Sequence, residues 1–445
     1  MTNKKTTATS EPQFGLAIAT SLVVGTMIGS GIFLLPASLA EFGTLGLLGW
    51  LMAATGALSL AYVFAKLSFW QPGLGGPYHF TRKNVGEFPA FLVAWGYWIS
   101  VWTGNAAIAM AAVSYAKLLF PVLIESTFLA TGLGLVFVWC FSAINIMGVR
   151  EAGITQLITT LCKAVPLMAF AVIGLLLLDW PTQWPQWSPS SETDNQHWLG
   201  AVVAAAALWL WAFLGVESAS IPANSIRDPK RTIPRATLIG ILLVAVIYGL
   251  GFLVVLITIP GPTLATSNGP FAEAAAILMG GWAGVAMTVV ALVSTLGALN
   301  GLILLGGQMP MAAAKDGLLP KFFAQQNKRQ APALGIFISA LLTSALLLTT
   351  ASKSLLGVFN FAILLSTTAI IIPYIFCSAA AFRVRMSRAK KGRWLSLSII
   401  LLAFLFSLWA VSGAGQEAVY WGFILIMLGV PVYTGLKVHS DQRPS

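Results

Sequence analysis

The sequence predicts an all-α membrane protein with twelve transmembrane helices, and its composition and its hydropathy pattern both support this fold class. Of the 445 residues, 58% are hydrophobic and only 9% are charged. A soluble domain carries about 25% charged residues, because its surface must meet water. A chain this poor in charge is expected to present most of its surface to lipid.

Twelve apolar runs are long enough to span a bilayer, which takes about 20 apolar residues in a helix. The first six runs lie at 14–40, 44–68, 88–117, 124–147, 152–178 and 198–224. The other six lie at 235–259, 271–310, 332–351, 355–382, 395–413 and 417–436. The run 271–310 is too long for one straight span, so we expect it to continue into a cytoplasmic turn after Gln308.

The basic residues predict the orientation. If the N-terminal tail 1–13 lies inside, the loops on the inner side contain most of the lysines and arginines: Arg82, Lys83, Arg150, Arg227, Lys230, Arg231, Arg235, Lys315, Lys321, Lys328, Arg329, Arg383, Arg385, Arg388, Lys390, Lys391 and Arg393. Only Lys117 and Lys353 lie near the opposite ends of the spans. The positive-inside rule therefore predicts an inner-membrane protein with both termini in the cytoplasm, including the tail 437–445.

Several other classes of protein are disfavoured. The net charge of +11 does not indicate a nucleic-acid partner, because no basic stretch alternates with aromatic residues. The three cysteines have no metal-ligand or disulfide spacing, and no P-loop occurs, so we expect neither a metal nor a cofactor. An intramembrane enzyme would need clustered catalytic groups, which the pattern lacks. A nutrient receptor would usually carry a soluble signalling domain, and the tail after residue 436 is too short for one.

The first and sixth spans are interrupted at corresponding places. The first contains Gly25-Thr-Met-Ile-Gly-Ser-Gly31, and the sixth contains Gly215-Val-Glu-Ser-Ala-Ser220 before Pro222. Unwound backbone at mid-bilayer is tolerated only where it lines a cavity. Paired breaks five spans apart predict two inverted repeats, at about 14–178 and 198–382, with a substrate between the broken helices and two added helices at 395–436.

An amino acid would suit such a site. Its carboxylate and its ammonium group lose water when they enter the membrane, so polar groups of the protein must take the place of that water. The N–H groups around Gly29-Ser30-Gly31 suit a carboxylate, and free carbonyls at the break in the sixth span suit an ammonium. The alternative for the glycines is close helix packing through small residues.

Two ionisable residues lie deep inside spans, where charge is costly and usually functional. Glu217 could sense a proton, pair with a cationic substrate or link to a gate, and its alternative is a structural hydrogen-bonded role. Lys163 could be a fixed positive charge or a proton carrier, and its alternative is a lysine that faces lipid. Trp211, six residues before Glu217, could cover a bound substrate or stack on a cationic one. Lipid-facing packing is the alternative for this ring.

Five motifs occur in order along nearly the whole chain. They are Gly25-Thr-Met-Ile-Gly-Ser-Gly-Ile-Phe-Leu-Leu-Pro36, Gly75-Gly-Pro-Tyr78, Trp211-Ala-Phe-Leu-Gly-Val-Glu-Ser218, Asp228-Pro-Lys-Arg-Thr-Ile-Pro234 and Lys315-Asp-Gly-Leu-Leu-Pro320. Together they resemble the amino acid–polyamine–organocation superfamily, and most of all its basic amino acid and polyamine antiporters. The resemblance implies a LeuT-type fold of two five-helix repeats plus two helices. It also implies sodium-independent exchange, a small amino acid or amine as the substrate, and a homodimer.

The resemblance also implies individual roles. Ser30 and Gly31 match a carboxylate-binding turn, Asn105 and Ser366 match polar contacts to substrate, and Trp211 matches an occluding ring. Tyr97, Glu217 and Tyr374 match a hydrogen-bonded outer gate. The full expected substrate site consists of Thr26, Ile28, Gly29, Ser30, Gly31, Ser100, Asn105, Trp211, Ala212, Leu214, Leu302 and Ser366.

Three positions depart from the arginine–agmatine exchangers. Leu302 replaces a tryptophan that sandwiches the guanidinium group, and an aliphatic side chain offers no cation–π attraction. Thr26 replaces an asparagine. Lys163 stands where those antiporters are apolar and resembles neutral amino-acid permeases, in which its ammonium stands in for a sodium ion. Two readings therefore remain: an antiporter that leans to basic amino acids and polyamines, or a proton-coupled permease or exporter of neutral amino acids.

Overall fold

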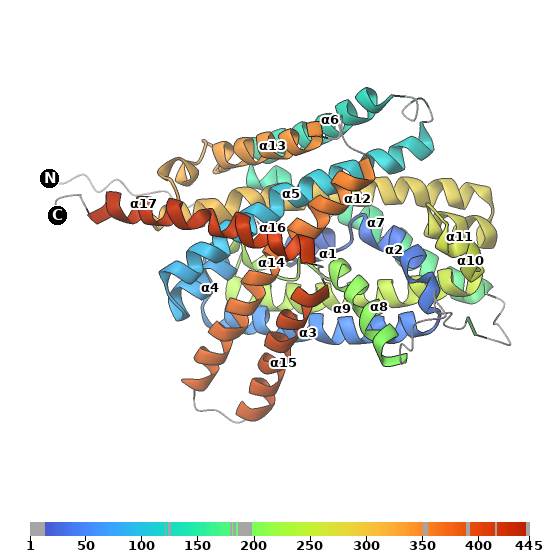
Figure 1. The fold of residues 1–445 in the computed structure, drawn as a ribbon, viewed down its shortest axis with the longest axis horizontal. Coiled ribbons are helices and arrows are strands. Elements are labelled where there is room, and N and C mark those ends of the chain that lie inside the picture. Colours follow the sequence, from blue (N-terminus) through green and yellow to red (C-terminus); the bar gives the residue numbers. More distant parts are fainter. Residues whose placement is uncertain are drawn as a thin grey trace.

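The computed structural model describes residues 14–120, 122, 126–178, 180, 184–185, 198–349, 355–388, 392–413 and 416–441, and these residues form a bundle of helices (Figure 1). The helices of the first half are α1 Leu16–Met27, α2 Gly31–Leu39, α3 Leu45–Trp70, α4 Pro77–Asn84, α5 Glu87–Leu119, α6 Thr127–Met147, α7 Val149–Leu177 and α8 Trp198–Ala212. Those of the second half are α9 Pro229–Thr258, α10 Gly261–Ala265, α11 Pro270–Met279, α12 Gly281–Lys315, α13 Ala333–Leu348, α14 Leu355–Met386, α15 Arg393–Gly413, α16 Gln416–Met427 and α17 Gly429–Asp441.

The predicted all-α membrane fold is confirmed. In the described part of the chain, ten helical segments are long and apolar enough to cross a membrane, and α8, α11 and α13 are shorter apolar helices. The number of twelve spans remains a prediction. Large side chains such as Leu176 and Trp394, each 80% exposed, cover the outer helices, as expected of a surface that meets lipid.

Both predicted interruptions are present. The first span is broken at residues 28–30, between α1 and α2. The sixth ends as an α-helix at Ala212 and continues through two 3-10 turns, Ser218–Ser220 and Ala223–Ser225. The predicted span 198–224 therefore does not continue as an α-helix after its break, because only short 3-10 turns follow.

Three further boundaries differ from prediction. The run 271–310 breaks at Gly280, whose φ of 93° lies in the region that favours glycine, and α12 continues past Gln308 to Lys315. The last run is divided between α16 and α17. Because α17 extends to Asp441, the expected tail 437–445 begins as helix, and the tail 1–13 lies outside the described residues.

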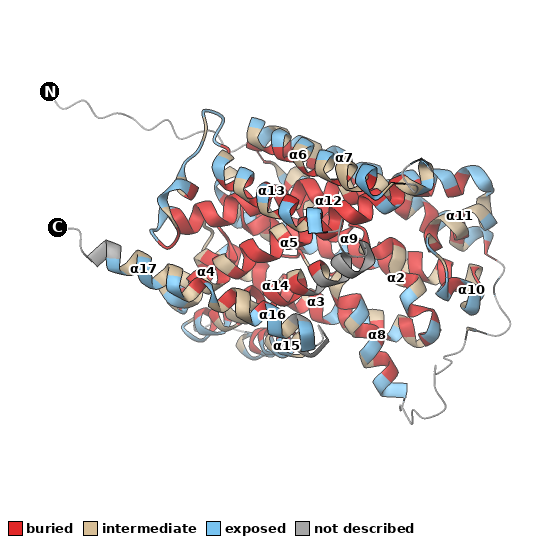
Figure 2. Ribbon diagram, turned by 45° about the horizontal axis from the view of Figure 1, so that its top comes forward, coloured by how far each residue is buried: buried red, intermediate tan, exposed pale blue. Residues whose placement is uncertain are grey.

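The two broken segments lie at the centre of the bundle. Figure 2 shows buried residues concentrated in the central helices, with exposed ones on the periphery around α6, α15 and α17. Helix α1 packs against α7, α9 and α12, Ile28 and Ser30 of its break are buried, and the long helices α12 and α14 pack along α5. This arrangement leaves the freed backbone groups of both breaks shielded from lipid, as their cost in hydrocarbon requires.

A polar network joins four helices at one end of the bundle. Arg82 Nη1 lies 2.9 Å from Asp316 Oδ2, and Lys437 Nζ lies 2.5 Å from Glu87 Oε2. Tyr78 Oη donates to Asp316 at 2.9 Å, and burial, together with this hydrogen bond, raises the pKa of Tyr78, so the hydroxyl keeps its proton. These contacts tie α4, the beginning of α5, the end of α12 and α17 together.

Candidate functional site

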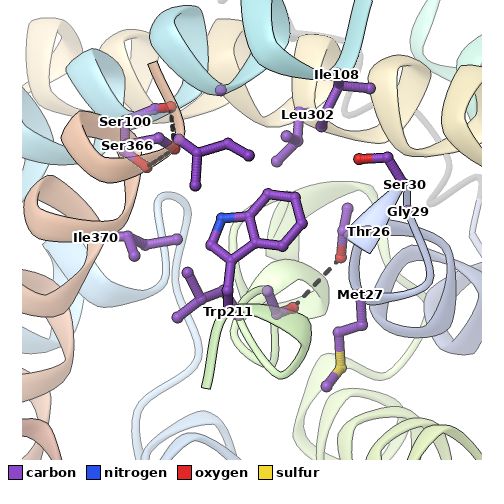
Figure 3. Close-up of a pocket in the computed structure, with 14 residues that line it drawn as sticks. Thr26, Met27, Gly29, Ser30, Ser100, Ile108, Trp211, Leu302, Ser366 and Ile370 are labelled. Atoms are coloured by element: carbon purple, nitrogen blue, oxygen red, sulfur yellow. Dashed lines mark hydrogen bonds between the residues drawn. The ribbon is translucent and has the colours of Figure 1, made fainter. Parts of the chain in front are cut away.

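A cavity of about 60 Å³ lies between the two broken segments (Figure 3). Its walls come from the break of α1, from α5, from the end of α8, and from α12 and α14. The lining residues are Thr26, Met27, Gly29, Ser30, Ser100, Gly104, Ile108, Trp211, Leu214, Gly215, Leu302, Ile363, Ser366 and Ile370. In Figure 3 the Trp211 ring projects into the middle of this lining, between Leu302 and Ile370.

The structure brings eight of the twelve expected substrate residues to the cavity wall. They are Thr26, Gly29, Ser30, Ser100, Trp211, Leu214, Leu302 and Ser366. Ile28, Gly31, Asn105 and Ala212 adjoin lining residues in the chain without lining the cavity themselves. Sequence reasoning missed six lining residues, although the spacing of Ser100, Gly104 and Ile108, one turn apart on α5, is a signal that could have found two of them.

Two buried polar atoms at the site have no hydrogen-bond partner within the described part of the chain. They are Ser30 Oγ and Asn105 Oδ1, and both residues are at most 2% exposed. Buried polar atoms are normally paired, so orphaned ones need an explanation. A polar ligand in the cavity would supply the missing partner for Ser30 directly, because Ser30 lines it.

The break of α1 exposes donors rather than acceptors. Lys163 Nζ donates to the carbonyls of Gly25 and Ile28, Tyr248 Oη donates to that of Met27, and Tyr115 Oη donates to that of Ser30. The first N–H groups of α2, in contrast, have no partner within their own helix. The break is therefore electrically suited to an anionic group, which a helix N-terminus favours.

Gly31 lets the indole approach the break closely. A Cβ on Gly31 would lie 2.2 Å from Cζ3 of Trp211, so no larger residue fits without moving the ring. The break in the sixth span has a similar requirement, because Gly215 has a φ of 105°. Its carbonyl accepts from Ser218 Oγ at 2.6 Å, and the Ala212 carbonyl accepts from Tyr248 Oη at 3.2 Å. These two carbonyls are thus already occupied, and the expected ammonium contact cannot rely on them alone.

The predicted gate residues are hydrogen-bonded to one another. Tyr97 Oη donates to Glu217 Oε1 at 2.9 Å, and Tyr374 Oη donates to Oε2 at 2.6 Å. Tyr97 precedes Ser100 towards the beginning of α5, and Tyr374 follows the lining residues of α14 towards Arg383. This is the side that the basic residues predict to be cytoplasmic, so the term outer gate does not fit the geometry.

Lys163 is fully buried and does not face lipid. Its ammonium lies 2.6 Å from the carbonyl oxygens of Gly25 and Ile28 and 3.2 Å from that of Ser294. Ser294 Oγ also donates to the Ile28 carbonyl at 3.0 Å, a contact that the sequence analysis missed. Three carbonyls from α1 and α12 thus surround one cation fixed to α7. No group of three potential metal ligands occurs among the described residues.

Comparisons with known proteins identify the family and the fold of this chain. Residues 14–433 match the family model of amino acid permeases. The chain is 31% identical to the cadaverine/lysine antiporter of Escherichia coli (strain K12), over 98% of this chain and 97% of that one. It is 30% identical to the putrescine transporter PotE of Haemophilus influenzae, over 97% and 98% of the two chains. A solved structure of a Na+-coupled sialic acid symporter, substrate-bound and outward-open, superposes with a TM-score of 0.57 at 11% identity, covering 92% of this chain and 90% of that one. This likeness supports the LeuT-type fold.

Proposed function

Because this chain belongs to the amino acid permease family, we propose that it is a sodium-independent antiporter of amino acids and their amine derivatives. It works by alternating access, in which a central site opens first to one side of the membrane and then to the other. The observation that carries the proposal is the cavity between the two helix breaks, with the unpaired Ser30 hydroxyl in its wall.

The cargo's head group binds at the break of α1. The carboxylate accepts from the N–H groups at the start of α2 and from Ser30, because the carbonyls nearby are already occupied by side chains. Asn105 follows the lining residue Gly104, and its buried Oδ1 lacks a partner in the described structure. It accepts from the ammonium of an amino acid or an amine once its side chain turns towards the cavity. A diamine without a carboxylate would use only the second contact.

The gates lie on either side of the bound cargo. Trp211 covers the cargo from within the cavity, and the Tyr97–Glu217–Tyr374 cluster closes the side nearer the basic helix ends. Opening that side requires Glu217 to give up one or both tyrosine hydrogen bonds. In the inner membrane, with both termini in the cytoplasm, this cluster is the inner gate.

Sodium independence is supported by Lys163. Its ammonium occupies the carbonyl cage formed by Gly25, Ile28 and Ser294, where a sodium ion would need the same oxygen ligands. A positive charge that belongs to the protein stabilises the break in every state in which the cage is assembled, so no ion has to be taken from solution.

The identity of the cargo side chain has two candidates. The relatives named for cadaverine, lysine and putrescine favour cationic cargo. A specific observation favours neutral amino acids: the cavity is lined by Ile108, Leu302 and Ile370, and no lining residue carries a charge. A second ammonium in this cavity would lose its water without gaining a carboxylate, which is costly in a low-dielectric site.

Counterflow in proteoliposomes tests the proposal. Vesicles preloaded with lysine, ornithine, cadaverine, putrescine or a neutral aliphatic amino acid are given the labelled compound outside, with and without sodium and with and without a pH gradient. We expect exchange that is unaffected by sodium, and the compound that exchanges fastest identifies the side chain. A Ser30→Trp variant, which fills the cavity, serves as the inactive control. Ser398→Trp makes the same substitution at an exposed position on α15 and should exchange as the wild type does. Failure of every amino acid and amine to exchange would overturn the proposal.

A further inference from the structure

Three basic residues lie on the segments that meet where α3 contacts α15, outside the transport site. They are Lys66 on α3, Arg388 just after α14, and Arg393 at the start of α15. We propose that this cluster, the α3–α15 basic site, binds the phosphate of an anionic membrane phospholipid.

Two contacts define how the helices meet. Tyr62 Oη of α3 donates to Ser396 Oγ of α15 at 2.9 Å, and further along the seam a Cβ on Gly56 would meet the Phe406 ring. Between these two contacts residue numbers rise along α3 as they fall along α15, and Figure 1 shows α15 crossing towards α3 rather than lying along it. The seam therefore has two distinct ends.

The basic residues lie at one end of that seam. Lys66 is one helical turn beyond Tyr62, and Arg393 is one turn before Ser396, so both extend past the same hydrogen bond. Lys66 Nζ lies 5.3 Å from the centre of the Tyr62 ring. The guanidinium carbon of Arg388 lies 5.3 Å from the ring of Trp70, which is one further turn along α3. The aromatic rings orient these cations without neutralising them.

Within the described part of the chain, no acidic side chain is found paired with Lys66, Arg388 or Arg393. The ion pairs found there have Arg82, Arg231 and Lys437 as their cations. Arg393 donates from Nη2 to the sulfur of Met386, a weak acceptor, and its buried Nε has no partner there. A guanidinium group presents a fork of donors that matches two oxygens of a phosphate.

The neighbouring surface favours a lipid over a free anion. Trp394 and Leu395, next to Arg393, are 80% and 71% exposed. Tryptophan is enriched at the membrane interface, and basic pockets between helices on the cytoplasmic side suit anionic head groups. A phospholipid can occupy the cationic groups with its phosphate and the exposed apolar side chains with its acyl chains, whereas inorganic phosphate can use only the first.

Native mass spectrometry of the full chain tests the site. The protein is released from micelles that contain phosphatidylglycerol or phosphatidylcholine with the same acyl chains, and the retained lipids are counted. The test variant is Lys66→Gln/Arg393→Gln. The matched control is Arg150→Gln/Lys321→Gln, which removes the same charge from exposed positions away from the seam. We expect the unmodified chain and the control to retain phosphatidylglycerol, and the test variant to retain at least about threefold less.

Four outcomes would overturn the proposal. The first two are equal retention of phosphatidylglycerol by the test and control variants, and equal retention of the two lipids by the unmodified chain. The third is displacement of phosphatidylglycerol by millimolar inorganic phosphate. The fourth applies if Arg393→Gln prevents folding, and is unchanged retention by the single variants Lys66→Gln and Arg388→Gln. The melting temperature of each variant separates loss of folding from loss of binding.

Discussion

At the scale of single residues, the tightest contact of the site is between Gly31 and Trp211. A Cβ added at Gly31 would lie 2.2 Å from the indole, so Gly31→Ala must displace the ring. We expect this variant to fold and to lose most of its exchange, by about tenfold or more, because a misplaced group near bound cargo is costly. Gly132→Ala is the control, since nothing lies within 4 Å of its Cβ position. If Gly31→Ala exchanges cargo at the wild-type rate, the position of the Trp211 ring does not matter for transport.

Lys163 is the second residue whose substitution is informative. Lys163→Met keeps most of the side-chain volume and removes the donor from the carbonyls of Gly25 and Ile28. A buried acceptor left unpaired costs about 1–3 kcal/mol. We therefore expect a lower melting temperature together with loss of exchange at every pH, measured by counterflow. Lys117→Met, at the end of α5, should change neither quantity. If Lys163→Met exchanges normally with an unchanged pH profile, the ammonium is not needed to hold the break.

The gate gives a third residue-level prediction. Glu217→Ala leaves the Tyr97 and Tyr374 hydroxyls without their shared acceptor, whereas Glu217→Gln keeps one carbonyl oxygen in place. We expect Glu217→Ala to leak in counterflow experiments, seen as faster efflux without cargo outside, and Glu217→Gln to lie between it and the wild type. Equal efflux from all three proteins would argue against a gating role.

At the scale of elements, the breaks were predictable and the structure after them was not. Gly29 and Gly215 lie where the helices unwind, whereas Gly25 remains inside α1. The turns that follow Gly215 form because Ser218 and Ser220 bond to the carbonyls of Gly215 and Glu217, and such local bonds compete with helix. A hydrophobic run cannot reveal this competition.

The short helix α4 carries an element-level prediction about pH. Burial lowers the pKa of His79, and the positive charge of Lys83 lowers it further. The His79 imidazole therefore binds a proton more readily in the unfolded chain than in the folded one. The stability that depends on neutral His79 is complete above about pH 6.5, the ordinary pKa of histidine, and is lost as the pH falls below it. We expect the melting temperature to drop less between pH 8 and pH 5.5 in His79→Gln than in the wild type. The same drop in both proteins would assign the acid sensitivity elsewhere.

At the scale of the whole molecule, the orientation can be tested with cysteines. Cys140 and Cys162 are exposed on the outer helices and are first replaced by alanine, whereas Cys377 is buried. In this background, an impermeant maleimide added to intact cells should label Lys117→Cys and spare Lys321→Cys. Labelling in the opposite pattern would invert the proposed orientation and with it the side on which the Tyr97–Glu217–Tyr374 cluster lies.

Much of the whole fold follows from the sequence, because hydropathy and charge act along the chain. Most helices lie within a few residues of their predicted positions, and both ionisable residues singled out for their depth, Lys163 and Glu217, are fully buried. Their partners were harder to predict. Lys163 binds backbone carbonyls, and every residue has one, so the sequence does not mark which carbonyls surround it. The role of Ser294 depends on how α12 packs against the α1 break. The break at Gly280 was missed, although the Gly280-Gly281 pair in the run 271–310 is a turn signal.

The ammonium held between α1 and α12 also has an energetic consequence. A sodium ion that enters from one side and leaves on the other brings the energy of its gradient, about 1.4 kcal/mol for each tenfold ratio. Lys163 is covalently part of α7, so it completes the cage without dissipating any gradient. Under the proposed exchange, the direction of flux is then set by the concentration ratios of the two cargoes and, where their charges differ, by the membrane potential. A cell would control this protein by producing or consuming those cargoes rather than by pumping sodium.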